Sequence, residues 1–273
     1  MQPSAPSLEF NLPATAVSDD SMNYFFALLL ILVSGWVGAA GNPIAHLYQS
    51  KGITGSLLIE SEEGAPRYEH NVNAAERFVP ASTFKIPNTL IILQEGLLEG
   101  ADDVITWDGV KREYDPWNQN QTLKTAFQRS CVWCYQRYAL QVGDAKYRTY
   151  LAQFDYGNGL TGPDVSRFWL DGELRVSVQD QILFLRKVVN ETLPIAPQHI
   201  KTLKDIMESD DRHGFKLWSK TGWSGRDGWF VGYLVVNGHT WYFANHIEIE
   251  QPSDLVFRQQ LTLDAFRVLG IIQ

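Results

Sequence analysis

The chain has 273 residues, a net charge of −8, a hydrophobic content of 45% and nine tryptophans. An acidic chain repels polyanions, so we expect no nucleic-acid partner. The length and apolar content are typical of a globular protein with one large domain or two packed lobes. The sequence contains no Gly-rich phosphate loop, no His-Glu-x-x-His motif and no Cys/His cluster with zinc spacing, and its six histidines are scattered. These observations disfavour nucleotide and metal chemistry.

The N-terminus carries an apolar run at Phe25–Val33, followed by four small residues at 38–41. The run is too short for a membrane span but has the length of a secretory signal, so residues 1–40 are expected to be cleaved after Ala40. The segment before the run has no lysine or arginine, which suits a start at Met22 with an upstream extension; an uncleaved anchor is the alternative. Residues 1–40 contain three acidic and no basic side chains, so the mature net charge would be −5 instead of −8.

The expected elements begin with a strand at 55–60 and a turn at 62–64, followed by a helix from Ser82 to about Leu98 that tolerates Pro87 near its start. Helical spacing of apolar residues recurs in four segments: 123–127, 132–142, 145–154 and 176–189. Strand-like composition then recurs at 215–219, 228–236 and 240–249, and a closing helix is expected at 261–269. Asn237-Gly238, between the last two strands, indicates a tight hairpin.

This order predicts an α/β fold of the α+β kind, with an antiparallel sheet built from both chain ends, flanking helices and a helical insertion lobe. Because no linker, repeat or low-complexity tract follows residue 40, we expect a single unit over 41–273. Its sheet lobe would cover about 41–75 and 205–273, and its helical lobe about 76–204. A side chain on the first helix of the insertion would face the seam between the lobes, where pockets tend to form.

The pair Ser82 and Lys85 lies at that position. Residues three apart share one face of a helix, so the lysine head group would lie near the serine hydroxyl. A serine becomes a good nucleophile when a neighbouring base takes its proton, and a lysine can help only when it is neutral or chemically altered. Apolar neighbours, including the run at 90–93, would bury the amine and favour its neutral form.

Further motifs follow this pair in a fixed order. They are Ser130-Cys131-Val132, Tyr156-Gly157-Asn158, Phe168-Trp169-Leu170 and Lys220-Thr221-Gly222. With Ser-x-x-Lys in front, this series resembles the class D (oxacillinase-type) serine β-lactamases over essentially the whole of 41–273. The resemblance implies the fold of serine β-lactamases and penicillin-binding proteins, and hydrolysis of penicillins, including oxacillin-type ones, that confers antibiotic resistance.

The resemblance also implies how the serine is activated. Ser82 would form the acyl-enzyme, and Lys85 would be carboxylated on its side-chain nitrogen by carbon dioxide or bicarbonate. This N6-carboxylysine would act as general base for acylation and deacylation, with no metal and no other cofactor. The indole of Trp169 would hold the carboxyl group, and Val132 and Leu170 would shield it.

Other residues would handle the leaving group and the substrate. By the same resemblance, Ser130 would pass a proton to the departing lactam nitrogen. Lys220-Thr221-Gly222 and Arg258 would bind the carboxylate region of the substrate. The backbone N–H groups of Ser82 and Trp223 would form the oxyanion hole.

Cys131 and Cys134 depart from the rest of the pattern, because the first of them lies inside the Ser-x-Val motif. In an oxidising compartment they could close a small disulfide that stiffens the Ser130 loop and alters the substrate range. The other interpretation is two buried, reduced residues that pack a helix. We favour the reduced pair, and we expect no redox role because a thioredoxin-like context is absent.

Two other classes share part of the series. β-Lactam sensor domains are acylated once and then signal, but they normally follow several membrane spans, whereas this chain has one short apolar run. Penicillin-binding peptidases more often carry Asn where this chain has Val132. The substrate range would depend on the loops at 107–118 and 224–228, and the sequence leaves the oligomeric state open. We therefore expect a periplasmic hydrolase that binds a small-molecule β-lactam, without stable membrane association after signal removal.

Overall fold

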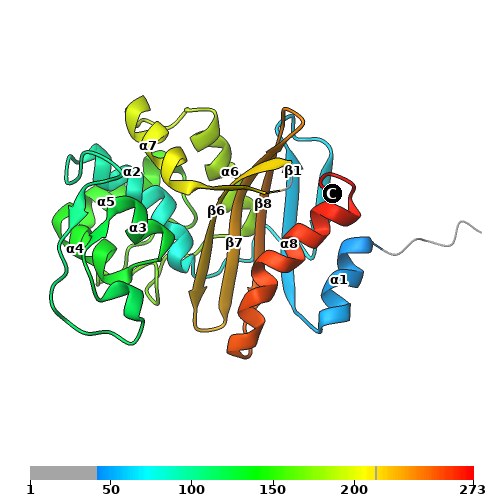
Figure 1. Cartoon of the computed structure of the whole chain (residues 1–273), viewed down its shortest axis with the longest axis horizontal. Coiled ribbons are helices and arrows are strands. Elements are labelled where there is room, and N and C mark those ends of the chain that lie inside the picture. Colours follow the sequence, from blue (N-terminus) through cyan, green and yellow to red (C-terminus); the bar gives the residue numbers. More distant parts are fainter. Residues whose placement is uncertain (1–41, 213) are drawn as a thin grey trace, which may run out of the picture. The chain divides into compact units, whose positions relative to one another are not determined.

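The central element is a six-stranded antiparallel sheet with the strand order β2–β1–β8–β7–β6–β5 (Figure 1). The strands are β1 (Gly55–Ser61), β2 (Arg67–His70), β5 (Glu208–Arg212), β6 (Phe215–Ser224), β7 (Asp227–Val236) and β8 (His239–Glu248). The computed structural model describes residues 42–212 and 214–273, so the signal-peptide prediction for 1–40 falls outside the described residues. β1 pairs with β8, with Gly55 opposite Ile247, and this confirms a sheet built from both chain ends.

Helices cover both faces of this sheet. They are α1 (Pro43–Lys51), α2 (Lys85–Gln94), α3 (Leu123–Gln128), α4 (Val132–Val142), α5 (Asp144–Phe154), α6 (Val178–Val189), α7 (Pro197–Met207) and α8 (Phe257–Val268). Short 3₁₀ helices are η1 (Ala81–Phe84), η2 (Asp115–Trp117) and η3 (Pro252–Val256), and β3 (Val104–Ile105) pairs with β4 (Gln121–Thr122) as a separate ladder. Figure 1 shows α1 and α8 together on one side of the sheet and the helices between η1 and β5 on the other. Within the described residues no helix is long and apolar enough to cross a membrane.

The alternation of side chains along the strands explains the two layers. Leu57 and Ile59 pack with α1 and α8, whereas Leu58 between them packs with the core of the helical insertion. On β7, Phe230 and Val231 divide between the two cores in the same way. Because both faces of the sheet are buried, the sheet provides a rigid wall for any site at its seam with the insertion.

The expected helix at Ser82 starts as the 3₁₀ turn η1 and continues as α2, which ends at Gln94. Pro87 is the third residue of α2, where the backbone N–H has no partner within the helix, so the proline removes no helical hydrogen bond. The hairpin prediction is confirmed: Asn237 and Gly238 join β7 to β8 with φ of 52° and 80°. Four elements of the structure, α1, β2, β5 and α7, were not predicted from the sequence.

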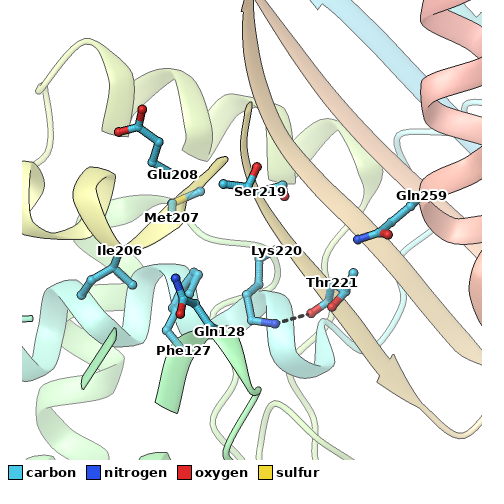
Figure 2. Close-up of a pocket in the computed structure, with 10 residues that line it drawn as sticks. Phe127, Gln128, Ile206, Met207, Glu208, Ser219, Lys220, Thr221 and Gln259 are labelled. Atoms are coloured by element: carbon cyan, nitrogen blue, oxygen red, sulfur yellow. Dashed lines mark hydrogen bonds between the residues drawn. The ribbon is translucent and has the colours of Figure 1, made fainter. Parts of the chain in front are cut away.

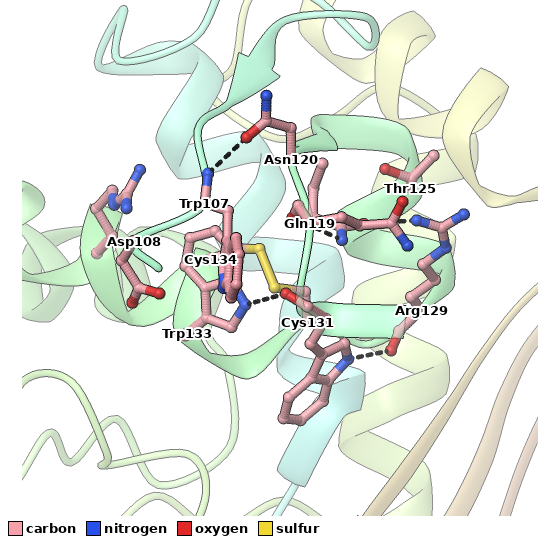
Figure 3. The surroundings of a disulfide bond; sticks show 12 residues. Trp107, Asp108, Gln119, Asn120, Thr125, Arg129, Cys131, Trp133 and Cys134 are labelled. Atoms are coloured by element: carbon pink, nitrogen blue, oxygen red, sulfur yellow. Dashed lines mark hydrogen bonds between the residues drawn. A yellow bond between two sulfur atoms is a disulfide. The ribbon is translucent and has the colours of Figure 1, made fainter. Parts of the chain in front are cut away.

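The structure contradicts the expectation of reduced cysteines, because Cys131 and Cys134 form a disulfide (Figure 3). Cys131 is the N-cap residue of α4 and Cys134 lies in its first turn. This geometry brings their Cα atoms to 5.5 Å, within the range that a disulfide spans. Both residues are fully buried, as the sequence analysis expected of a packed pair.

Candidate active site

Ser82 lies in η1, at the seam between the sheet and the helical insertion. The residue before it, Ala81, has a φ of 50°, a left-handed conformation that a non-glycine residue adopts only where its surroundings hold it. The hydroxyl of Thr83 donates to the carbonyl of Pro80 at 2.7 Å and fastens this turn. The backbone is therefore shaped around Ser82 rather than left in a regular helix.

Lys85 is fully buried directly behind the serine. Its Nζ donates to the Oγ of Ser82 at 3.0 Å, and it lies 5.1 Å from the ring centroid of Tyr135. Burial lowers the pKa of Lys85 well below the usual 10.5, and the nearby Lys220 lowers it further. The predicted serine–lysine pair is thus in contact, with an amine whose neutral form is favoured.

Trp169 has a buried donor without a partner. Its side chain is fully buried and stacks on the ring of Phe84, with centroids 5.4 Å apart, yet Nε1 makes no hydrogen bond. Nearly all buried polar groups in proteins are paired, and Trp169 Nε1 is one of four buried side-chain atoms in the described residues that have no partner among the protein atoms. Phe84 directly precedes Lys85, and this donor fits a carboxyl group carried by that lysine.

Lys220 approaches the same seam from β6. Its Nζ donates to the hydroxyl of Ser130 and, at 2.9 Å, to the carbonyl of Thr221. Burial lowers the pKa of Lys220 to about 7, with a further contribution from the charge of Arg258. Ser130 itself has a φ of 53°, a second non-glycine residue in the left-handed region beside this seam.

Gly222 explains how β6 comes so close to η1. A Cβ at this position would lie 2.9 Å from the carbonyl oxygen of Pro80 and 3.3 Å from the backbone nitrogen of Thr83, so a larger residue would push the two segments apart. The carbonyl of Gly222 accepts from Nη1 of Arg258 at 2.8 Å, and Nε of that arginine donates to Leu255. Burial lowers the pKa of Arg258.

A cavity of about 450 Å³ opens above these residues. Seven of the predicted site residues line it: Ser82, Ser130, Val132, Thr221, Gly222, Trp223 and Arg258. Four others, Lys85, Trp169, Leu170 and Lys220, do not line it. The predicted residues therefore divide into a group that a ligand could touch and a group behind it.

Leu170, one of the predicted residues that do not line the cavity, is hydrogen-bonded to the end of β6. The hydroxyl of Ser224, at the end of that strand, donates to the carbonyl of Leu170. Tyr156, from the Tyr-Gly-Asn motif, is fully buried, and Gly157 lies against the carbonyl of Arg175.

Four further residues line the cavity and were not among the predicted site residues: Tyr114, Trp117, Gln128 and Arg129. Gln128 and Arg129 immediately precede Ser130, so their adjacency was a usable signal. Tyr114 and Trp117 come from the loop that was expected to influence substrate range, and their rings form an edge-to-face pair with centroids 5.5 Å apart.

A second cavity of about 320 Å³ lies beside the first, between α3, α7, β6 and α8 (Figure 2). Gln128 and Thr221 line both cavities, and Lys220 lines the second. In the part of the chain that the structure describes, no group of three or more His, Cys, Asp or Glu side chains could hold a metal ion.

A serine hydroxyl bonded to a buried lysine, beside a Lys-Thr-Gly strand of a six-stranded antiparallel sheet, defines a penicillin-binding type of site. In agreement, the family model described as penicillin binding protein transpeptidase domain matches residues 45–265. β-Lactamase OXA-3 of Pseudomonas aeruginosa is 38% identical over 221 residues, which cover 80% of this chain and 79% of the relative. β-Lactamase OXA-48 of Klebsiella pneumoniae is 34% identical over 84% of this chain and 88% of its own.

Solved structures agree. The class D β-lactamase YbXI from Nostoc superimposes with a TM-score of 0.80 at 35% identity, covering 83% of this chain and 98% of its own. The chain belongs to the class D β-lactamase family. The resemblance inferred from the motif order is confirmed.

Proposed function

We propose that the protein hydrolyses penicillins, including oxacillin-type β-lactams, through an acyl-enzyme on Ser82, and that it thereby confers antibiotic resistance. The observation that carries this proposal is the 3.0 Å contact between Lys85 Nζ and Ser82 Oγ, combined with the lowered pKa of the buried lysine. Family membership supports the substrate class.

In acylation, Oγ of Ser82 attacks the lactam carbonyl and loses its proton to a base. The carbon–nitrogen bond of the lactam opens, the nitrogen takes a proton from the hydroxyl of Ser130, and Ser130 takes one in turn from the Nζ of Lys220 that contacts it. The backbone N–H groups of Ser82 and Trp223 stabilise the oxyanion, an effect typically worth about 3–4 kcal/mol per donor.

The base involves a modification of Lys85. Its neutral amine reacts with carbon dioxide to give N6-carboxylysine, and the bound carboxyl group supplies the general base for acylation and deacylation. Trp169 Nε1, a buried donor without a partner, holds this group. Val132, which lines the cavity, and Leu170, which packs against the core, limit the access of bulk water.

The substrate carboxylate binds at the other end of the cavity. Thr221 and Arg258 line the cavity there, and Lys220 lies behind it with its amine bonded to Ser130. The guanidinium of Arg258 is aligned by the carbonyls of Gly222 and Leu255, and it keeps donors free for a planar carboxylate.

The mature enzyme acts in the periplasm. A signal peptide within residues 1–40 directs it there, and residues 41–273 form one catalytic unit with its active site at the seam of the two lobes. Its partner is a small-molecule β-lactam, and no further cofactor than carbon dioxide takes part.

The test follows the lactam absorbance of excess penicillin with the purified protein. We expect sustained turnover that rises with added bicarbonate and that is lost in Ser82→Ala. A single stoichiometric burst that leaves a stable adduct on Ser82 would instead identify a β-lactam sensor or binding protein, and would refute the deacylation step.

A further inference from the structure

The disulfide lies inside the catalytic machinery rather than at the periphery of the fold. Cys131 directly follows Ser130, and the bridge to Cys134 encloses Val132 and Trp133 (Figure 3). The two cysteines are the only ones in the sequence, and both side chains are fully buried. The bridge therefore constrains the segment that presents a hydroxyl to the cavity.

The first consequence concerns the backbone of Ser130. Its left-handed φ of 53° is the conformation of a residue that follows the end of a helix, here α3, and hydrogen bonds of the helix end hold it. On the N-terminal side, the N–H groups of Ser130 and Cys131 donate to Phe127 and Ala126 at 3.1 and 2.8 Å. On the C-terminal side, Cys131 begins α4 without a side-chain hydrogen bond to cap it, and the disulfide is the connection that ties it to the first turn.

The second consequence concerns the aromatic wall of the cavity. The indole of Trp117 donates to the carbonyl of Arg129 at 2.9 Å, and the indole of Trp133 donates to the carbonyl of Trp117 at 3.1 Å. Trp117 is thus held from both sides by the residues around the bridge. The guanidinium groups of Arg112 and Arg137 lie 5.1 and 5.0 Å from the ring of Trp133 and keep that ring in place.

We propose that the Cys131–Cys134 disulfide is a positioning element of the active site, which holds the Ser130 hydroxyl for proton transfer and the Trp117 wall for substrate side chains. This inference rests on the proposed function, because it assumes that Ser130 acts in acylation. Loss of the bridge lets the segment relax, and a displacement of about 1 Å at a reacting group can cost on the order of 100-fold in rate. We expect a smaller loss, about tenfold in kcat/KM, because the hydrogen bonds of Ser130 and Cys131 remain.

The main experiment is a double-mutant cycle between the bridge and Ser130. Cys131→Ala/Cys134→Ala, Ser130→Ala and their combination are compared in kcat/KM for a penicillin and in the rate of Ser82 acylation by a fluorescent penicillin. If the bridge acts through Ser130, removing it costs about tenfold in the parent and less than twofold once the serine is alanine. Equal losses in both backgrounds would overturn the proposal, since the bridge would then be merely structural.

The second part of the proposal, the positioning of Trp117, is tested with Trp133→Phe, which removes the hydrogen bond to Trp117 and keeps the disulfide. We expect a higher KM for penicillins with bulky side chains and little change in kcat for small ones. An unchanged KM ratio between bulky and small substrates would refute the role of the bridged segment in the cavity wall. Acylation rates are measured independently of turnover. A wild-type protein that is acylated but does not hydrolyse penicillin would refute the proposed function. The acylation rates of the double-mutant cycle would still test the positioning proposal.

Folding is checked by circular dichroism and thermal unfolding. If the alanine pair does not fold, Cys131→Val/Cys134→Val fills the space with apolar volume. The wild-type chain refolded in dithiothreitol, which supplies two electrons and two protons to give two thiols, provides a third form without the bridge. If none of the three forms folds, the bridge is a folding requirement and the positioning proposal is wrong.

Discussion

The unpartnered indole of Trp169 leads to a prediction with a matched control. Trp169→Phe removes a donor that has no protein partner, whereas Trp229→Phe removes one that donates to the carbonyl of Val79 at 2.8 Å. Both tryptophans are fully buried, so the two substitutions delete the same atoms from equally dry sites. The difference between the variants therefore isolates the hydrogen bond.

In buffer free of carbon dioxide, Trp229→Phe leaves the Val79 carbonyl unpaired, which costs about 1–3 kcal/mol beyond the lost volume. Trp169→Phe leaves no protein group unpaired, so its free energy of unfolding should fall less. For the activity measured with bicarbonate we expect the opposite order, with a larger loss in Trp169→Phe than in Trp229→Phe. A hydrogen bond to a charged acceptor contributes about 1.5–3 kcal/mol. Losing it should raise the bicarbonate concentration for half-maximal activity roughly 10- to 150-fold in Trp169→Phe.

The assay measures penicillin hydrolysis against bicarbonate concentration in degassed buffer, together with the ¹³C NMR signal of the lysine carboxyl group from ¹³C-bicarbonate. Urea unfolding gives the stability of each variant. Identical bicarbonate dependence in the wild type and in Trp169→Phe would refute the assignment of this donor. An equal shift in Trp229→Phe would show that the effect comes from general loosening of the core.

Three further predictions follow from the same geometry. Because burial lowers the pKa of Lys220 from its usual 10.5 to about 7 in the folded state, the unfolded state holds more protons between these values, and wild-type stability should rise with pH there. Lys220→Met should remove up to about 1.4 kcal/mol per pH unit of this rise, as measured by urea unfolding at pH 7 to 10, and equal slopes would contradict the burial of the amine. Arg258→Gln should raise the KM for penicillins by roughly tenfold or more through the lost charge-assisted bond, with kcat less affected; an unchanged KM would exclude carboxylate binding there. Gly222→Ala places a Cβ 2.9 Å from the Pro80 carbonyl and should cost about 1–3 kcal/mol in stability together with most of the activity, whereas Gly100→Ala, with open space around it, should change neither.

The site could be predicted further from the sequence than its surroundings could. Ser82 and Lys85 are recognisable because few residue types perform this chemistry, and a spacing of three places them on one side of a helical turn. The aromatic wall is different. Tyr114 and Trp117 reach the cavity only because their loop folds back onto the segment before α4, through the contact of Trp117 with Arg129, and no local pattern encodes that contact.

The features that were not predicted from the sequence were missed for different physical reasons. α7 was readable, because Pro197 opens it and its buried residues, Ile200, Leu203 and Ile206, recur every three positions. β5 was not readable: its sequence, Glu-Ser-Asp-Asp-Arg, has no apolar alternation, and it is a strand because the edge of β6 provides a partner. The disulfide could not be decided from the sequence, because the spacing of three residues beside the predicted helix at 132–142 allows both the bridge and two buried, reduced cysteines.

The sheet of this enzyme cannot be completed before β8 has been synthesised, because β1 pairs with β8. During synthesis β1 leaves the ribosome long before β8 exists, and until then Leu57, Leu58 and Ile59 have no complete sheet to join. Pairing between segments this far apart in the sequence forms late, and the edge of β1 that faces β8 stays unpaired until it does. A premature stop codon anywhere upstream of β8 therefore leaves the sheet beside the active site incomplete, even though Ser82 and Lys85 have already been translated.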